Sequence, residues 1–143
     1  MNVRELRPQD NASWLRMRLA LWPDSEPHEV DDFLAGRARE PLAVLVAEEG
    51  GSLLGFAELS IRNIAEGCTT GRVGYLEGWY VEPSARRRGI GRALVAAAED
   101  WARAEGCSEF ASDTEIDNEA SAAAHAALGF GEVERIRCFR KVL

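Results

Sequence analysis

The stretch from Tyr75 to Leu94, YLEGWYVEPSARRRGIGRAL, constrains the fold more than any other part of the chain. It begins with an apolar and aromatic run typical of a strand, continues through a basic turn that contains Gly89 and Gly91, and enters an Ala-rich segment with helical spacing. Backbone N–H groups at the start of a helix, with the positive end of the helix dipole behind them, bind phosphate groups. The stretch therefore predicts a strand, a phosphate-binding loop and a helix in succession.

Periodicity predicts the elements on either side of this stretch. Before it we expect a strand at 3–7, helices from 9 or 10 to 22 and from 27 to 39, and a hairpin of strands 43–48 and 53–62. After the turn we expect a helix at 91–105, a strand at 109–113, a helix from 118 or 119 to 128, and a last strand from Val133 to Val142. This order predicts a single α/β domain over residues 1–143, with one mixed sheet and helices on both faces.

Composition and charge exclude several classes of protein. A net charge of −7 and a pI of about 4.9 argue against nucleic-acid binding, and suit either a cationic partner or simple solubility. The charged N-terminus and the lack of an apolar run of ~20 residues predict no signal peptide and no membrane span, hence a cytoplasmic protein. Three widely spaced cysteines predict neither a disulfide framework nor a zinc site.

The turn Arg86-Arg87-Arg88-Gly89-Ile90-Gly91 fits the pattern R/Q-x-x-G-x-G/A. Together with the order of elements, it resembles the GNAT acyl-coenzyme A N-acetyltransferases over essentially the whole chain. A Rossmann fingerprint does not fit, because Leu94 stands where its third small residue should be, and no Gly-Lys-Ser/Thr follows for a Walker A loop. A solvated Arg-rich surface turn is the remaining alternative. The resemblance implies a mostly antiparallel sheet splayed at its central strand, acetyl-CoA as co-substrate and no metal.

The resemblance also implies which residues hold the coenzyme. Main-chain N–H groups from Arg87 to Arg92 would bind its pyrophosphate, and the strand from Trp79 to Val81 would pair with its pantetheine arm. Asn118 either contacts the far side of that arm or is only a helix N-cap. The full set of implied coenzyme-binding residues is Trp79, Tyr80, Val81, Arg86, Arg87, Arg88, Gly89, Ile90, Gly91, Arg92, Asn118 and Ser121.

Acetyl transfer requires an amine to lose a proton and a leaving thiolate to gain one. Glu77 and Asp113 are the candidate proton acceptors, because they lie on the central strand and at the end of the next one, where the two would diverge; the alternative is two strand-edge acids facing water. His125 stands where many GNAT proteins have a tyrosine that protonates the thiolate. It is either that acid or a hydrogen-bonded packing residue.

A narrower likeness is carried by four segments: LALWP (19–23), GYLEGWYV (74–81), ASDT (111–114) with Asp117-Asn118, and Ala124-His125 with Leu128-Gly129-Phe130. These are similar to the aminoglycoside 6′-N-acetyltransferases, enzymes of antibiotic resistance. The likeness implies that Trp22 stacks beside a polycationic substrate, unless it is only a core aromatic.

The same likeness implies that Glu77, Asp113 and Glu134 bind the amines of an aminoglycoside. We expect Glu77, Trp79 and Tyr80 to face the acceptor side of the sheet. The likeness also implies a homodimer in which loop 64–70 borders the pocket of its own subunit or that of the second subunit. The rival functions are a GNAT enzyme for another cationic amine, such as a polyamine or a peptide amine, and a non-catalytic acyl-CoA-binding regulatory module.

Overall fold

The computed structural model of the chain describes every residue from 1 to 143. In chain order its strands and helices are β1 (Asn2–Glu5), α1 (Asn11–Leu21), α2 (Pro27–Leu34), β2 (Ala43–Glu49), β3 (Ser52–Arg62), β4 (Val73–Val81), α3 (Ile90–Ala104), β5 (Glu109–Ser112) and α4 (Glu119–Ala127). Each coincides with a predicted element. The largest difference in length is in α2, which ends before Gly36, a residue whose positive φ of 74° is typical of a helix C-terminus.

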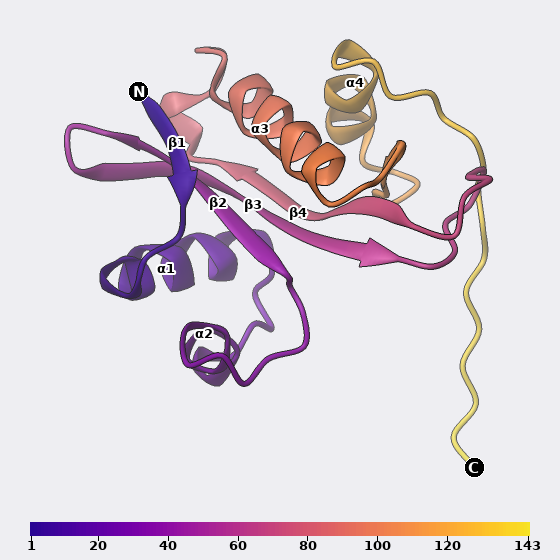
Figure 1. Cartoon of the computed structure of the whole chain (residues 1–143), viewed down its shortest axis with the longest axis horizontal. Helices are drawn as coiled ribbons and strands as arrows, with labels where there is room; N and C mark the ends of the chain where they lie inside the picture. The colour runs from indigo at the N-terminus through magenta and orange to yellow at the C-terminus, as the bar shows by residue number, and fades with distance from the viewer.

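The strands form one sheet in the order β1-β2-β3-β4-β5. Its first three junctions are antiparallel and the last, between β4 and β5, is parallel, which confirms the mixed, mostly antiparallel sheet. Helices α1 and α2 cover one face, and α3 and α4 cover the other (Figure 1). No helix is both long and apolar enough to cross a lipid bilayer.

Each face of the sheet has its own hydrophobic core. On the α3 face, Leu94 of α3 and Leu76 of β4 belong to one buried cluster. On the α1–α2 face, Trp14 of α1 packs in a second cluster with Phe56 of β3. Complete burial of side chains of this kind contributes about 1.5–3 kcal/mol each. The two cores therefore hold the sheet rigidly between its helices.

Strand β4 carries a β-bulge at Glu77. Leu76 pairs with Leu59 of β3 and Gly78 pairs with Glu58, so Glu77 has no partner on the neighbouring strand. An extra residue of this kind bends the strand and reverses the alternation of side chains beyond it. The bulge therefore decides which face each later residue of β4 presents.

Strands β4 and β5 separate halfway along β4. Their pairing ends at Leu76 and Ser112, although β4 continues to Val81. The edge of β4 over residues 77–81 consequently has no strand beside it on that side. A free strand edge can pair with an extended, amide-containing ligand, and the separation confirms the predicted splay.

The predicted last strand, Val133 to Val142, is wrong for the isolated chain. Residues 131–143 contain no helix or strand, and all of them are exposed. In Figure 1 this segment runs past the ends of β3 and β4 and away from the body of the protein. A strand needs a neighbouring strand for its backbone hydrogen bonds, and this segment has none within its own chain.

Candidate active site

A row of unpaired backbone N–H groups lies between β4 and α3. The amides of residues 87–92 donate no hydrogen bond to the protein, and the first that does is Ala93, to the Gly89 carbonyl at 3.0 Å. Positive φ angles of 62° at Arg87 and 80° at Gly89 bend the loop. Unpaired amides at a helix N-terminus form an anion-binding site. The loop therefore fits the phosphate groups expected from the sequence.

Most arginine side chains of this loop are already engaged by protein groups. Their partners are the Val81 carbonyl for Arg86 (2.9 Å), the Glu49 carboxylate for Arg88 (2.7 Å) and the Ala127 carbonyl for Arg92 (3.4 Å). Arg87 makes no side-chain hydrogen bond or ion pair and is exposed. Backbone amides and Arg87 are thus the anion-binding groups that this loop offers.

Trp79 lies beneath the same loop, on the α3 face. A Cβ atom on Gly91 would stand 3.0 Å from its Cζ2 atom, so a larger residue at position 91 would have to displace the indole. The expectation that Trp79 faces the acceptor side is wrong, because the bulge at Glu77 turns this residue to the opposite face. The Trp79 Nε1–H is buried without a partner, which leaves a donor for a ligand at this edge.

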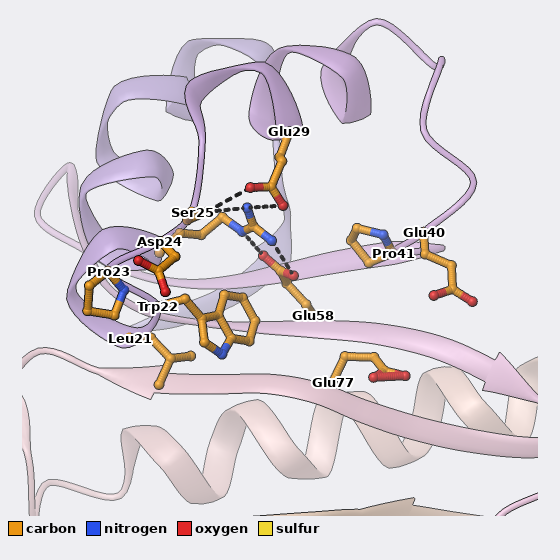
Figure 2. A pocket seen from close by; sticks show the side chains of 11 residues that line it. Leu21, Trp22, Pro23, Asp24, Ser25, Glu29, Glu40, Pro41, Glu58 and Glu77 are labelled. Atoms are coloured by element: carbon orange, nitrogen blue, oxygen red, sulfur yellow. Dashed lines mark hydrogen bonds and ion pairs between the residues drawn. The ribbon is translucent and has the colours of Figure 1, made fainter. Parts of the chain in front are cut away.

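A cavity of about 550 Å³ opens on the other face of the sheet. Its lining comes from α1, α2, the loops that follow them, β3 and β4, as Figure 2 shows. The lining residues are Arg18, Leu21, Trp22, Pro23, Asp24, Ser25, Glu29, Glu40, Pro41, Glu58 and Glu77. Five carboxylates and one guanidinium give the cavity a negative potential that attracts cations.

Two of these carboxylates are free to bind a ligand. Asp24 follows the end of α1 and Glu40 precedes β2, so both come from loops, and both are exposed. Neither makes an ion pair or a hydrogen bond within the protein. Because each carboxylate can accept several hydrogen bonds from an ammonium group, they are the most available cation-binding groups of the cavity.

The cavity floor is a buried ion pair between Arg18 of α1 and Glu58 of β3. The Arg18 Nε donates to Glu58 Oε1 at 2.5 Å, and Trp14 Nε1 donates to the same oxygen at 3.1 Å. Arg18 also donates to Ser25 Oγ at 2.7 Å, which ties the loop after α1 to the floor. Burial raises the pKa of the Glu58 carboxyl above its ordinary value, and the Arg18 guanidinium opposes that shift.

Glu77 lies at the inner end of the cavity, at the bulge. Its Oε1 accepts hydrogen bonds from Ser60 Oγ at 2.7 Å and Arg62 Nε at 2.9 Å, and Oε2 accepts from Arg62 at 2.8 Å. The side chain is only 23% exposed. A bidentate arginine fixes both carboxylate oxygens in position, at the point where β4 leaves β5.

Asp113 follows β5 directly, where the two strands diverge, but it does not line the cavity. Its Oδ2 accepts a hydrogen bond from Tyr75 at 2.6 Å. Burial, and then this bond, raise the pKa of the Tyr75 hydroxyl well above its ordinary value, so Tyr75 stays a neutral donor. The Arg62 guanidinium stacks 3.6 Å from the Tyr75 ring centroid. Asp113 and Glu77 are therefore linked through Tyr75 and Arg62.

His125 lies on the opposite face, in α4. Its Nδ1 is 2.7 Å from the Ser121 carbonyl and must donate to it, while Nε2 is 2.8 Å from Ser112 Oγ. The Ser112 hydroxyl is also 3.3 Å from the Leu76 carbonyl, at the last β4–β5 pair. The ring packs edge-on against Trp79, with centroids 5.4 Å apart. His125 thus packs between elements and is connected to the splay point through Ser112.

Trp22 has features of both predicted roles. It lies 6.2 Å from Phe56, centroid to centroid, as a core aromatic would, and Arg18 lies 5.0 Å from its ring centroid. It also lines the cavity and is half-buried. A Cβ on Gly78 would stand 2.3 Å from the Trp22 Cη2 atom, so the ring packs directly against the bulged strand at this glycine. Tyr80 lies on this face as expected, packed 6.0 Å from Phe56.

Three other predicted features lie outside the cavity. Asn118 is the N-cap of α4, where its side chain accepts a hydrogen bond from the Ser121 amide at 3.0 Å. Glu134 is exposed in the C-terminal segment, away from the cavity of its own chain. Loop 64–70 does not line that cavity either; Glu109 holds it by accepting hydrogen bonds from the Thr69 and Thr70 amides.

Sequence reasoning missed several residues of this site. Arg18 and Glu58 occupy core positions of a helix and a strand that lie far apart in the sequence, so no local pattern connects them. Asp24 and Glu40 stand in loops that carried no pattern, and Ser112 is a single hydroxyl beside the predicted Asp113. The excess of acidic residues was the one signal that pointed to such a cavity.

Comparisons with known proteins agree with this geometry. The acetyltransferase (GNAT) family model matches residues 6–130. An aminoglycoside N(6′)-acetyltransferase type 1 from Klebsiella aerogenes is 58% identical, over 99% of this chain and 96% of the relative. One of the same name from Stenotrophomonas maltophilia is 41% identical, over 99% and 93%.

Solved structures give the same result. The enzyme AAC(6′)-Iy, in complex with the bisubstrate analogue CoA-S-monomethyl-acetylneamine, superposes with a TM-score of 0.91 at 35% identity, over 99% of this chain and 98% of that one. The apo enzyme AAC(6′)-IG from Acinetobacter haemolyticus superposes with a TM-score of 0.91 at 37% identity, over 100% and 99%. No group of three or more His, Cys, Asp or Glu side chains that could hold a metal is present.

Proposed function

The chain belongs to the acetyltransferase (GNAT) family, and on that premise we propose that it transfers acetyl from acetyl-CoA to the 6′-amine of aminoglycosides. The observation that carries the proposal is the cavity with five carboxylates and an indole wall, which meets the splayed strand opposite the phosphate-binding loop. Aminoglycosides are polycations of amino sugars, so a negative cavity with an aromatic wall is complementary to them. A relative co-crystallised with a conjugate of CoA and neamine supports the same pairing of donor and acceptor.

On the donor side, acetyl-CoA supplies an acetyl thioester. The amides of residues 87–92 and Arg87 would hold its pyrophosphate, and the free edge of β4 at Trp79 to Val81 would hold its pantetheine arm. The unpaired Trp79 Nε1–H fits this assignment, because it leaves a buried donor next to the loop. These residues would bind and orient acetyl-CoA, and they would take no part in proton transfer.

On the acceptor side, Asp24 and Glu40 would bind ammonium groups of the substrate, and Trp22 would stack on a sugar ring. Glu77 would take the proton from the reacting amine, directly or through one water, since it alone among the cavity carboxylates lies on the splayed strand. Asp113, fixed by Tyr75, would hold another amine beside the splay.

The leaving thiolate would take the Ser112 hydroxyl proton while His125, entering the step as an imidazolium, passes its Nε2 proton to Ser112 Oγ. The neutral imidazole that results keeps its proton on Nδ1, which donates to the Ser121 carbonyl, and Nε2 regains a proton from water before the next turnover. We expect His125→Phe, which keeps the packing against Trp79, to lower kcat by about 10²-fold. Ser112→Ala should lower kcat by a similar factor, and the kcat of the double variant should be little lower than that of either single variant. An unchanged kcat in His125→Phe would remove this pathway.

The decisive experiment is a panel of amines. Purified protein is assayed for acetyl-CoA consumption with kanamycin, tobramycin, spermidine and a lysine-containing peptide, and each product is mapped by NMR. We expect turnover with the aminoglycosides and acetylation at the 6′-nitrogen. Faster turnover with spermidine or the peptide would reassign the substrate, and tight binding of acetyl-CoA without turnover of any amine would indicate a regulatory module.

Substitutions in the cavity test the acceptor assignment. Asp24→Asn and Glu40→Gln should each raise the KM for aminoglycoside about 5–10-fold, by loss of one charge-assisted hydrogen bond, with an unchanged KM for acetyl-CoA. Asp100→Asn, an exposed change on α3, is the matched control and should alter neither constant. Glu77→Gln should instead lower kcat by about 10²-fold or more. If Asp24→Asn changed the KM for aminoglycoside no more than Asp100→Asn does, a binding role for Asp24 would be excluded.

The proposal includes an oligomeric state and a cellular location. We expect the enzyme to act as a homodimer, which sedimentation can measure. We also expect it in the cytoplasm, where acetyl-CoA is available and its three free cysteines would stay reduced. Recovery in a membrane or extracellular fraction would contradict that location.

A further inference from the structure

The Ser112 hydroxyl and the His125 imidazole form a pair whose hydrogen-bond direction is fixed by a third group. His125 Nδ1 lies 2.7 Å from the Ser121 carbonyl, which can only accept, so Nδ1 carries a proton. In the neutral imidazole Nε2 then has a lone pair, and Ser112 Oγ, 2.8 Å away, must donate to it. A hydroxyl that donates to an imidazole held by a third group is the arrangement of an activated nucleophile.

Packing holds the imidazole in this orientation. The ring lies edge-on to Trp79, with centroids 5.4 Å apart, and edge-on to Phe130, with centroids 5.2 Å apart. Nδ1 also lies 3.4 Å from the Ser121 hydroxyl oxygen, one turn earlier in α4. The Ser112 hydroxyl has a second acceptor in the Leu76 carbonyl, but at 3.3 Å this is the longer contact. With one proton to donate, the hydroxyl favours the imidazole.

The pair stands at the inner end of the path expected for the coenzyme arm. Ser112 is the last residue of β5 that pairs with β4, and beyond it the edge of β4 is free. The row of unpaired amides at 87–92 marks the other end of that path. Trp79 lies between the two ends, against Gly91 and against His125, and its buried Nε1–H has no partner in the protein. An arm held by these groups brings its thioester to Ser112.

We propose that Ser112 is also a nucleophile, and that the protein has a second activity, the slow hydrolysis of acetyl-CoA when no amine is bound. This activity rests on the donor half of the proposed function. Ser112 Oγ attacks the carbonyl carbon of the thioester, and its proton passes to His125 Nε2. The C–S bond breaks, the CoA thiolate takes that proton from Nε2, and the acetyl group is left as an ester on Ser112.

Water completes the cycle. It attacks the carbonyl carbon of the ester while the neutral imidazole takes its proton, and this proton passes to Ser112 Oγ as the ester C–O bond breaks. The products are acetic acid and CoA, and the serine and the imidazole regain their starting states. Backbone N–H groups on the free edge of β4 donate to the carbonyl oxygen that becomes negative in both steps.

The two activities use opposite directions of one hydrogen bond. In transfer to an amine, the imidazolium passes a proton through Ser112 toward the thiolate. In hydrolysis, the neutral ring takes the proton of Ser112. A bound amine reaches the thioester from the cavity, on the other face of the sheet, and consumes it first. Hydrolysis is therefore expected only while the cavity is empty.

Isotope exchange detects an acetyl-enzyme even where it does not accumulate. Purified protein is incubated with acetyl-CoA and isotope-labelled CoA in the absence of amine, and mass spectrometry measures the label that enters acetyl-CoA. Exchange requires a protein group that keeps the acetyl while one CoA leaves and another binds. We expect exchange, release of CoA and, after an acid quench, a peptide with one acetyl group on Ser112.

Four variants test the assignment of the nucleophile. Ser112→Ala removes the hydroxyl and should abolish exchange. His125→Phe keeps the packing but removes the base, and it should lower both exchange and CoA release by about 10²-fold. Ser112→Cys keeps a nucleophile and should retain exchange, with the acetyl group on residue 112 as a thioester. Ser108→Ala, at an exposed hydroxyl just before β5, is the matched control and should change neither rate.

Three results would overturn the proposal. CoA release without exchange would indicate direct attack by water, and exchange at the wild-type rate in Ser112→Ala would indicate another nucleophile. Binding of acetyl-CoA in calorimetry with neither exchange nor CoA release would exclude the second activity altogether. The amine panel decides the proposed function separately. Turnover of aminoglycosides without exchange would refute only the second activity, and exchange without turnover of any amine would refute only the proposed transfer.

Discussion

Replacing Arg18 by methionine should destabilise the protein strongly, because it leaves Glu58 as a buried charge without its partner. Glu58 is 3% exposed and Arg18 is 7% exposed. Removing one partner of a buried ion pair costs about 3–5 kcal/mol. The Trp14 Nε1–H still donates to Glu58 at 3.1 Å, which favours the lower end of this range. With an unfolding entropy of about 0.3 kcal/mol/K for a chain of this length, the loss in Tm is about 10 °C.

The size of this loss should depend on pH. Burial raises the pKa of Glu58, and removing Arg18 raises it further. The folded state then holds a proton that the unfolded state has released, so the free energy of unfolding falls as pH rises from about 4 through the raised pKa. We therefore expect the Tm of Arg18→Met to lie further below that of the wild type at pH 8 than at pH 5.

Two companion variants isolate the cause. Glu58→Gln added to Arg18→Met removes the buried charge but keeps an acceptor for Trp14, so it should recover most of the Tm and abolish the pH dependence. Arg37→Met removes a surface arginine paired with Asp32 and should change the Tm by less than about 3 °C. The assay is calorimetry at pH 5 and pH 8. Equal losses at the two pH values, or no recovery in the double variant, would refute an unpaired charge as the cause.

Three further results are expected. Gly78→Ala should displace the Trp22 ring, which the new Cβ would meet at 2.3 Å, and raise the KM for aminoglycoside about tenfold while the KM for acetyl-CoA stays constant. Gly91→Ala places a Cβ 3.0 Å from Trp79, beside the phosphate-binding loop. In steady-state kinetics it should raise the KM for acetyl-CoA and leave the KM for aminoglycoside unchanged. The KM for aminoglycoside should also rise with ionic strength between 0.01 and 0.3 M salt, because the carboxylates of the cavity are screened; an unchanged KM would argue against electrostatic recognition.

The donor half of the site was predictable from local sequence, because it depends on neighbours in the chain. The turn from Arg86 to Gly91 follows a strand and opens a helix, and the structure has the same arrangement. The acceptor half was predictable only in part. Glu77 was predicted as an acid on the central strand, but its bulge comes from pairing with β3, and no feature of β4 alone shows where that register shifts.

The C-terminal segment, residues 131–143, has the sequence of a strand but does not form one. The residues from Val133 to Val142 have the composition and alternation of a strand, and the prediction of a strand failed only because backbone groups need a partner that their own chain does not provide. The Arg18–Glu58 ion pair was not predicted for a related reason. Its two residues are 40 positions apart, and a local sequence pattern does not show a contact between such distant residues. Periodicity therefore predicts which segments can form strands and helices, whereas their partners follow from the packing of the whole assembly.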